Sequence, residues 1–424
     1  MKVLVIGGGG REHAIAWKLR QSPRVTQLIC TPGNGGIAEE AECLPGDVKD
    51  IPSLVAVAQK LGIDLTVVGP EVPLNLGIVD EFQKRGLRIF GPTKAAAQLE
   101  SSKSFAKEFM QRHNVPTPHY AICLNMEDVK SALPLFKTPL VVKADGLAAG
   151  KGVVIAQTKE EAAHTAAEML SGKVLAGAGS RVVLEEFLQG EEISFLVLSD
   201  GERVAPLVAA QDHKRIGEGD TGANTGGMGA YSTDSLLDAQ MRDWLVTHVA
   251  KPVIAGMKQE DMEYRGILYC GLMMTARGPM VLEFNCRFGD PETQPILMRL
   301  ESDLLDAFEA SIDGRVSDGD FKWSTDSTAC VVIASGGYPD SYEGGKAISG
   351  LKEASQVEGV KIFHAGTSKR GDQYLTSGGR VLGVTGRARD LGVALDRAYE
   401  AAAKIKFEGM YYRKDIGARA LVKK

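Results

Sequence analysis

The segment that most constrains the fold is VLEFNCRFGDPET, residues 281–293, two-thirds of the way along the chain. Its first half alternates polar and apolar residues, as a β-strand does when successive side chains point to opposite faces. Glu283, Asn285 and, if the strand continues that far, Arg287 are therefore expected to share one face. The residues of the other face are expected to enter a core, and they are Leu282, Phe284 and Cys286. The segment predicts a strand that presents a carboxylate, an amide and a guanidinium in a row.

This row of polar groups suits a metal site that is completed by phosphates. A carboxylate and a neutral amide oxygen are too few ligands to surround Mg²⁺, unless phosphate oxygens supply most of the others. Arg287 is placed to bind an anion beside that metal. The simpler interpretation is an edge strand with a solvated polar face that ends in a Gly-Asp-Pro turn. This segment alone does not decide between the two.

Length and charge limit the classes of function that are possible. A chain of 424 residues with a formal net charge of −5 suggests two to four domains and no electrostatic footprint for nucleic acid. No signal peptide and no apolar run of membrane-spanning length is found, so no membrane partner is expected. The 6 cysteines are scattered and form no Cys-x-x-Cys pair, as expected for free thiols in a reducing cytoplasm.

The first hundred residues have the pattern of a doubly wound α/β domain. An apolar run at 2–6 is followed by four glycines, Gly7–Gly10, and by a helix that begins near Arg11. Further strands are expected at 27–30, 65–68 and 87–90, and helices at 51–61 and 76–85. This alternation predicts a Rossmann-like parallel sheet.

The glycine loop of this domain argues for an anion rather than a dinucleotide. The third glycine of a dinucleotide fingerprint falls on Glu12, and the second strand ends in Thr31-Pro32 rather than an acidic residue. Backbone N–H groups at a helix N-terminus still bind anions, and a sugar phosphate is the natural ligand. A tight turn without any ligand remains the alternative.

The middle of the chain carries a lysine strand, a glycine-rich loop and a possible purine hinge. The strand that ends at Lys143 is followed by small residues up to Gly152 and by a second strand, which is not the P-loop arrangement. Such a loop can close over a triphosphate, with Lys143 and Lys151 supplying charge. Residues 185–188 follow another apolar strand and could read adenine through their backbone. A hairpin with solvated lysines and an acidic turn are the simpler alternatives.

Residues 217–231 contain too many glycines for a regular element, and the charged segment 211–215 precedes them. Long glycine-rich loops in compact domains are usually functional or disordered, so a substrate loop is expected here. His213 could act in acid–base chemistry or simply be solvated. From residue 327 onwards, short strands and a helix near 389–405 indicate a small α+β domain.

Taken in order, the Lys143 strand, the glycine lid, the adenine hinge and the Glu283–Asn285 pair resemble the ATP-grasp ligases. Longer motifs resemble the glycinamide ribonucleotide synthetase family over essentially the whole chain, and they lie at 5–14, 32–36, 145–152, 224–230 and 287–293. One departure is Gly8, where the family often has Asn, which puts a small polar contact in doubt. The fold class implied is α/β and α+β: a Rossmann-like domain at 1–100, an ATP-grasp domain at 101–326 with its lid at about 120–190, and a C-terminal α+β domain at 327–424.

The resemblance implies an enzyme of purine biosynthesis. Glycine, 5-phosphoribosylamine and ATP would give glycinamide ribonucleotide, ADP and phosphate through glycyl phosphate, with Mg²⁺ or Mn²⁺ bound. The sequence has no Ser/His/Asp or Cys/His arrangement, which agrees with a mechanism that needs no nucleophilic side chain. A monomer in the cytoplasm is expected.

The resemblance also implies roles for individual residues. Catalytic roles would fall on Arg287, Lys143 and Asn224, and the metal would be held by Glu283 and Asn285. The residues expected to bind ATP are Lys103, Lys143, Gly150, Lys151, Gly152, Glu185, Phe187, Leu188 and Glu192. The residues expected to bind the other substrates are Gly8, Gly9, Gly10, Arg11, Glu12, Asp212, Lys214, Gly226, Gly227, Met228, Arg287, Asp290 and Pro291. The sequence does not decide whether Glu191 or Glu192 contacts ribose.

Three other functions are compatible with parts of the pattern. An ATP-grasp ligase or carboxylase could act on another acid and amine, although the first-domain loops and the 224–229 loop argue against this. A Rossmann oxidoreductase is disfavoured by Glu12 and by Thr31-Pro32. A regulatory module could bind ATP without turning it over.

Overall fold

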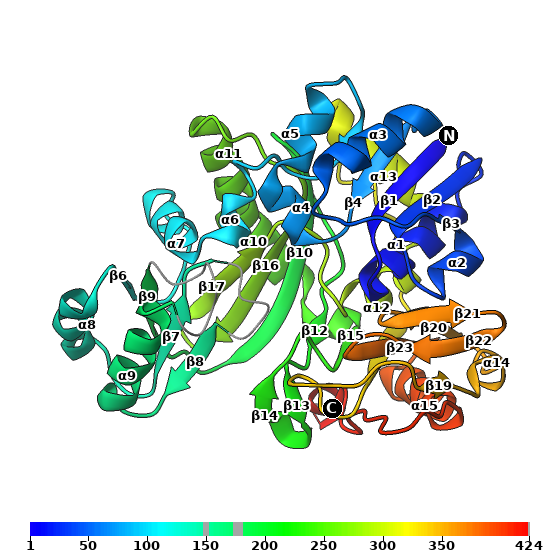
Figure 1. The fold of residues 1–424 in the computed structure, drawn as a ribbon. Helices are drawn as coiled ribbons and strands as arrows, with labels where there is room; N and C mark the ends of the chain where they lie inside the picture. The colour runs from blue at the N-terminus through cyan, green and yellow to red at the C-terminus, as the bar shows by residue number, and fades with distance from the viewer. Residues whose placement is uncertain (147–151, 173–180, 423–424) are drawn as a thin grey trace.

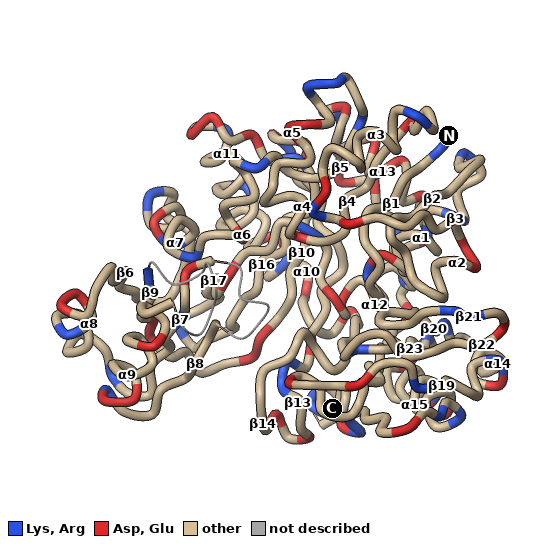
Figure 2. The backbone as a smooth tube through the Cα atoms, in the orientation of Figure 1, with Lys and Arg blue, Asp and Glu red and all other residues tan. Residues whose placement is uncertain are grey.

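The computed structural model describes residues 1–146, 152–172 and 181–422, which form three parts around a central sheet (Figure 1). The N-terminal part, blue in Figure 1, lies above the orange C-terminal part, and a small teal sheet stands out to one side. Acidic and basic residues are interspersed along the backbone in each part (Figure 2). Within the described residues, no helix is long and apolar enough to cross a bilayer.

The N-terminal part is a parallel sheet, which confirms the expected Rossmann-like arrangement. Its five strands lie in the order β3-β2-β1-β4-β5. They are β1 (Lys2–Gly7), β2 (Gln27–Pro32), β3 (Glu42–Cys43), β4 (Leu65–Val68) and β5 (Ile89–Phe90). The helices are α1 (Gly10–Arg20), α2 (Ile37–Glu40), α3 (Ile51–Leu61), α4 (Glu71–Leu76) and α5 (Ile78–Gln83). The single helix expected at 76–85 is wrong, because Gly77 takes a left-handed φ of 90° and separates α4 from α5.

The small teal sheet is antiparallel and has the order β6-β9-β7-β8. Its strands are β6 (Tyr120–Cys123), β7 (Leu140–Ala144), β8 (Val153–Ala156) and β9 (Val182–Glu186). Helices α8 (Met126–Ala132) and α9 (Lys159–Leu170) pack on it and share its apolar core. This sheet, which we call the lid sheet, therefore has a core of its own.

The central sheet is also antiparallel, with the order β11-β10-β16-β17. Its strands are β10 (Glu191–Asp200), β11 (Val204–Pro206), β16 (Arg265–Thr275) and β17 (Gly278–Asn285). Its helices are α6 (Gln98–Ser101), α7 (Lys103–Arg112), α10 (Ala239–Leu245) and α11 (Lys251–Gln259). A π-helical turn at Val246–Ala250 joins α10 to α11.

The C-terminal sheet has the order β12-β15-β18-β23-β20, and two of its strands come from the middle of the chain. Its strands are β12 (Gln211–Asp212), β15 (Gly229–Ser232), β18 (Ser327–Ala334), β23 (Arg380–Ala388) and β20 (Val360–His364). The glycine-rich segment, which was expected to contain no regular element, forms the hairpin of β13 (Arg215–Gly217) and β14 (Thr221–Asn224) before it enters β15, so that expectation is wrong. The 224–229 loop thus runs directly into the C-terminal sheet.

The remaining elements complete the C-terminal part and join it to the first. They are α12 (Thr293–Arg299), α13 (Leu304–Asp313), β19 (Ala347–Ile348), α14 (Leu351–Ala354), β21 (Thr367–Arg370), β22 (Gln373–Thr376), α15 (Leu391–Lys404) and α16 (Ala418–Val422). Helix α1 packs against α12 and β20, so residues from both ends of the chain meet at one seam. Three loops meet at that seam: the glycine loop at 7–10, the 224–229 loop and the turn at 289–291, which follows β17.

Candidate active site

Strand β17 presents Glu283 and Asn285 on the polar face that the sequence predicts, but it ends at Asn285, before Arg287, and it has one irregularity. Glu283 lies opposite Gly271, whereas Val281 lies opposite Leu272, so Leu282 has no partner in the ladder. This β-bulge turns Leu282 out of the core, where it was expected, and leaves it only partly buried. Its carbonyl accepts a hydrogen bond from Lys143 Nζ at 3.2 Å, which joins the lid sheet to the central sheet.

The Glu283 carboxylate is surrounded by positive charge but is not bonded to it. Burial alone raises the pKa of Glu283, but the cations around it, first of all Lys214, hold that pKa below its ordinary value. The other cations are Lys143, Lys103 and Arg287. Among the described residues, none donates a hydrogen bond to this carboxylate or pairs with it within 4.0 Å. Glu283 is thus an anion whose oxygens remain available to a ligand.

The residues present fit a divalent cation that shares its ligands with a phosphorylated substrate. Within the described ranges, no group of three or more His, Cys, Asp or Glu could hold a metal ion. Glu283 and Asn285 point to the same face of β17, and the Asn285 Oδ1 also accepts from Arg287 Nη2 at 3.2 Å. An anionic oxygen and an amide oxygen with a second lone pair are suitable but incomplete ligands for Mg²⁺ or Mn²⁺.

Lys143 is held at the end of β7 by a buried carboxylate. Glu185 on β9 is 1% exposed, and its Oε2 lies 2.9 Å from Lys143 Nζ and 3.3 Å from Lys107 Nζ. Burial lowers the pKa of Lys107 to about 8, although Glu185 opposes the shift. The other oxygen, Glu185 Oε1, is buried and has no hydrogen-bond partner within the described chain. One carboxylate therefore positions two lysines and keeps one oxygen free.

Lys103 begins helix α7 and, like Lys143, places its positive charge near Glu283. Its Nζ donates to the carbonyl of Gly146 at 2.9 Å, and burial lowers its pKa, partly offset by Glu283. The glycine-rich lid falls mostly on 147–151, so Gly150 and Lys151 lie outside the described residues. Gly152 is described, and its carbonyl accepts from Ala144 N at 2.8 Å.

The expected purine hinge connects β9 to β10. Leu188 is buried and Phe187 is partly buried between the two strands. Glu192 pairs with Lys214, with Nζ 2.6 Å from Oε2, while Glu191 follows the alternation of β10 to the opposite side. Glu192 and Asp212 lift the pKa of Lys214 well above its ordinary value, despite its burial.

Arg287 lies between carboxylates that the sequence reading did not single out. Its Nη2 is 2.8 Å from Glu100 Oε1 on α6, and its Nε is 3.5 Å from Glu71 Oε2 on α4. Burial raises the pKa of Glu100, even against the charge of Arg287. The guanidinium is thus fixed by the N-terminal part and by α6 rather than extended into solvent.

The first glycine loop is organised by Glu12. Its Oε2 accepts from Gly9 N at 2.6 Å, and its Oε1 lies 2.5 Å from Arg11 Nε. A Cβ on Gly69 would lie only 2.1 Å from Glu12 Oε1, so the missing side chain makes room for this carboxylate. Arg11 N donates to Asp290 Oδ2 at 3.4 Å. Two N–H groups of the expected phosphate loop are therefore already held by carboxylates.

The 224–229 loop packs on the Asp290-Pro291 turn. Gly227 has a φ of 113°, and a Cβ there would lie 2.4 Å from Pro291 Cδ. Met228 is fully buried, its N–H donates to the carbonyl of His213 and its carbonyl accepts from Val332 N, so the expected substrate contact finds no support at this residue. Gly9 and Gly10 approach Asp290 from the first glycine loop, where an added Cβ would come within 3.4 Å of Asp290 Oδ2 and 3.7 Å of Asp290 Oδ1, respectively. Gly8 lies away from Asp290, because a Cβ there would meet the carbonyl of Gly33 at 2.4 Å. The expected substrate loops do meet at one place.

Several carboxylates lie near Asp212. Burial raises the pKa of Asp212 to about 7, and the nearby carboxylates of Glu292, Glu192 and Glu283 add to the shift against Lys214. Glu292 itself accepts hydrogen bonds from Ser194 Oγ at 3.1 Å and from Tyr269 Oη at 3.0 Å. Asp212 and Lys214 thus connect β12 to the face of β17 that carries Glu283.

His213 points the other way, into the C-terminal part. Its Nε2 accepts from Gly417 N at 3.0 Å, and burial, with Arg413 and Arg419, lowers its pKa to about 4. The neutral imidazole supports the end of the chain rather than the polar cluster. Its place gives no support to the acid–base role that the sequence left open.

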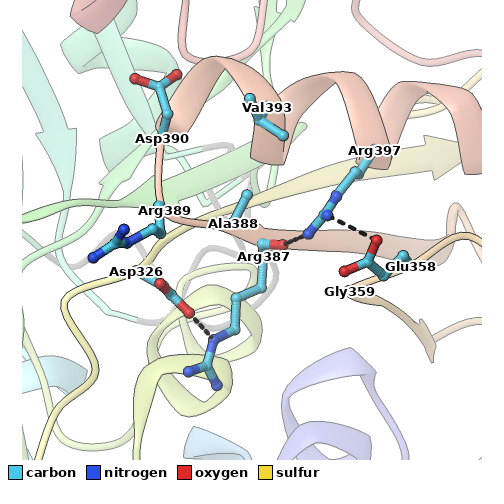
Figure 3. Close-up of a pocket in the computed structure, with 9 residues that line it drawn as sticks. All are labelled: Asp326, Glu358, Gly359, Arg387, Ala388, Arg389, Asp390, Val393 and Arg397. Atoms are coloured by element: carbon cyan, nitrogen blue, oxygen red, sulfur yellow. Dashed lines mark hydrogen bonds and ion pairs between the residues drawn. The ribbon is translucent and has the colours of Figure 1, made fainter.

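A separate open cavity of about 500 Å³ lies between the end of β23 and the start of α15 (Figure 3). Arg387 Nε pairs with Asp326 at 2.7 Å and Arg397 Nη2 with Glu358 at 3.2 Å, so these arginines bind the protein's own carboxylates. None of the expected site residues lines this cavity. It is not the site described above.

Several site residues were missed by the sequence reading. Lys107 follows Lys103 by four positions, so its place on the same face of a helix could have been predicted. Glu71 and Glu100 have no comparable local signal, because they reach Arg287 only through the fold.

Comparison with known families matches the phosphoribosylglycinamide synthetase N domain over residues 1–100, its ATP-grasp (A) domain over 101–293 and its C domain over 328–419. A phosphoribosylamine–glycine ligase from Vibrio cholerae is 50% identical over 429 residues, covering 100% of this chain and 99% of the relative. One from Pseudomonas aeruginosa is 49% identical, with the same coverage.

Comparison with solved structures agrees with the family matches. The crystal structure of phosphoribosylamine–glycine ligase from Thermotoga maritima is similar with a TM-score of 0.85 and 32% identity, covering 98% of this chain and 100% of its own. A biotin carboxylase from Campylobacter jejuni is similar with a TM-score of 0.76 at 16% identity, covering 100% of this chain and 95% of its own. The second likeness concerns the fold alone.

Proposed function

The chain belongs to the phosphoribosylglycinamide synthetase family, and we propose that the space around Glu283 is where it joins glycine to 5-phosphoribosylamine. The reaction is that of a phosphoribosylamine–glycine ligase in purine biosynthesis: ATP, glycine and the amine give glycinamide ribonucleotide, ADP and phosphate. The residue roles, the metal and the order of the chemical steps are the proposal. The confirmed resemblance supports the reaction, and the site geometry supports the roles.

ATP is proposed to lie between the lid sheet and the central sheet. Lys143 and Lys103 face this space from two elements and would contact the phosphates. The backbone at 187–188 would contact adenine. The unpartnered Glu185 Oε1 is a free acceptor in the same space, and we propose that it accepts a hydrogen bond from the nucleoside.

Glu283 and Asn285 would hold Mg²⁺ or Mn²⁺. The metal, when bound, would neutralise charge on the phosphates of ATP. The observation that carries the proposal is the Glu283 carboxylate itself, which four cations keep ionised while none of them bonds to it. A structural carboxylate in such surroundings would be expected to form at least one ion pair.

A carboxylate such as that of glycine is a poor electrophile, so it must first be activated by phosphorylation. We propose that Lys143, Lys103 and Arg287 stabilise the negative charge while the glycine carboxylate attacks the terminal phosphorus of ATP, the bond to the bridging oxygen breaks, ADP leaves and glycyl phosphate forms. The amine would then approach from the loops at 8–12, 224–229 and 290–291, with Asn224 beside it. Its nitrogen attacks the acyl carbon and phosphate leaves, so no side chain forms a covalent intermediate.

We also propose a cellular compartment and an oligomeric state. The cytoplasm suits a chain whose 6 cysteines are all free, because thiols persist where the medium is reducing. A monomer suits a site to which all three parts of one chain contribute.

The experiment that tests the function is the release of ADP in the presence of Mg²⁺ and glycine, with and without phosphoribosylamine made in situ. Release that requires both glycine and the amine is the expected result. Binding of ATP without release would contradict the ligase reaction, and release with other acids or amines would contradict the assigned substrates.

A further inference from the structure

Arg380, the first residue of β23, reaches from the C-terminal part to two loops of the proposed amine site. Its Nη1 donates to the carbonyl of Gly226 at 2.6 Å and to the carbonyl of Asp290 at 2.7 Å. Its Nη2 lies 3.5 Å from the carboxylate of Asp290. A single guanidinium therefore ties the 224–229 loop to the Asp290-Pro291 turn. Only Arg presents several donors in one rigid plane that can reach acceptors on two segments at once.

A second side chain of the C-terminal part holds the other polar group of the same glycine. The hydroxyl of Tyr338 accepts from Gly226 N at 3.0 Å. Within the described residues, no other group bonds to the backbone of Gly226, although this glycine lies exposed at the loop surface. A Cβ on Gly226 would lie 2.9 Å from Arg380 Cζ, so the guanidinium packs directly on the loop.

Asp290 extends this connection to the N-terminal part. Its carboxylate accepts from Arg11 N at 3.4 Å and from Gln294 Nε2 at 3.1 Å. Burial alone raises the pKa of Asp290, but Arg380 and Arg11 hold it below its ordinary value. The carboxylate is thus kept ionised between an arginine of the C-terminal part and the first glycine loop.

From these contacts we propose that Arg380 is a positioning residue for the amine substrate, because it holds the loops at 224–229 and 290–291 against the glycine loop that precedes α1. Tyr338 supports it by accepting the hydrogen bond from Gly226 N. The inference rests on the proposed function, because those loops are where the amine is placed. The C-terminal part is then a component of the amine site and not only a cover for it. The ATP side of the site, around Lys143 and Glu185, makes no contact with Arg380.

Strand β23 also contains a matched control, Arg387. It forms an ion pair with a carboxylate, as Arg380 does, but it contacts neither of the two loops. Its Nε is 2.7 Å from Asp326 Oδ2, and its side chain is 33% exposed against 22% for Arg380. The experiment compares Arg380→Met, Arg380→Lys, Tyr338→Phe and Arg387→Met with the wild-type chain by initial rates of ADP release. Each substrate is varied in turn with the other two saturating.

For Arg380→Met we expect the KM for phosphoribosylamine to rise about tenfold, since two charge-assisted hydrogen bonds are lost, while the KM for ATP stays within about twofold. Arg380→Lys should recover part of the loss, because lysine keeps the positive charge but not the planar set of donors that reaches both loops. Tyr338→Phe should show a smaller change in the same direction, and Arg387→Met no change in either KM.

The inference is overturned if Arg380→Met leaves the KM for the amine unchanged, or raises both KM values together as a general structural defect would. If Arg380→Met does not fold, Tyr338→Phe decides by the same criterion. A wild-type chain that releases no ADP would instead refute the proposed function. The two failures are therefore distinguishable.

Discussion

Lys143 and Glu185 face each other on neighbouring strands of the lid sheet, with Nζ 2.9 Å from Oε2 and both side chains almost fully buried. The same Nζ donates to the carbonyl of Leu282, which the bulge in β17 makes available. The pair thus holds a positive charge at the junction between the lid sheet and the central sheet. This is where the phosphates of ATP are proposed to lie.

Substitution of Lys143 by Met is expected to harm the use of ATP more than that of glycine. A charge-assisted contact to phosphate contributes roughly 1.5–3 kcal/mol, which corresponds to a rise of about tenfold or more in the KM for ATP. Glu185 keeps Lys107 as a partner, so the fold should persist. Initial rates over a range of ATP concentrations test this, with Lys130→Met on the exposed face of α8 as the control. An unchanged ATP dependence would remove Lys143 from the phosphate site.

Replacement of Glu283 by Gln is expected to lower turnover by about two orders of magnitude, as loss of a group that stabilises charge in phosphoryl transfer does. The variant should also need more Mg²⁺ for half-maximal rate. Near-UV circular dichroism should stay unchanged, because the amide fills the same volume. Glu202→Gln, in the exposed turn after β10, is the control. Wild-type turnover and metal dependence in Glu283→Gln would show that the metal is held elsewhere.

Much of the fold follows from local patterns in the sequence. The period-2 alternation of 283–285 predicted the polar face of β17, and the run 51–61 predicted α3 with the same bounds. These elements are specified by residues that lie next to one another, so a single chain segment contains the information. The same holds for the strand that ends near Lys143.

Features that depend on long-range contacts could not be predicted in this way. Leu282 was expected in the core, but the bulge opposite Leu272 is a property of the pair of strands rather than of β17 alone. Arg380 and Glu100 act on loops that are far away in sequence, and neither carries a local motif. The role of Glu12 also depends on Gly69, which leaves room for its carboxylate only when β1 and β4 are paired.

The carboxyl group of Asp212 is expected to make stability depend on pH. Burial raises its pKa from an ordinary value of 3.8 to about 7, so between these values the folded chain keeps a proton that the unfolded chain has lost. The free energy of unfolding therefore falls as pH rises from about 4 to 7 and is constant above, with a loss of order 1 kcal/mol or more. Urea unfolding of wild type and Asp212→Asn across this range measures the effect of Asp212 and its charged neighbours, because groups distant from Asp212 cancel in the difference.

At low pH the protonated carboxyl resembles the amide, so the two proteins should be nearly equally stable near pH 4. The wild type should then lose stability relative to Asp212→Asn as pH rises. A difference that stays constant from pH 4 to 7 would mean that the carboxyl titrates at its ordinary value.

Gly227 combines a left-handed backbone with close contact, so Gly227→Ala is expected to damage the amine loop. The φ of 113° is strained for any side chain, and the added Cβ would lie 2.4 Å from Pro291 Cδ. Backbone strain alone costs about 1–3 kcal/mol. The close contact would also displace the loop or the Asp290-Pro291 turn. We therefore expect the melting temperature to fall and the KM for phosphoribosylamine to rise.

Gly278 separates these two effects. Its φ is 103°, but an added Cβ would meet nothing within 4 Å at this position, the first residue of β17. Gly278→Ala should therefore lower the melting temperature by a comparable amount through strain, with no selective change in the KM for the amine. If both variants lose amine affinity equally, the loss follows stability rather than the packing of Gly227 on Pro291. If only Gly227→Ala loses it, the seam between these two residues shapes the site where the amine binds.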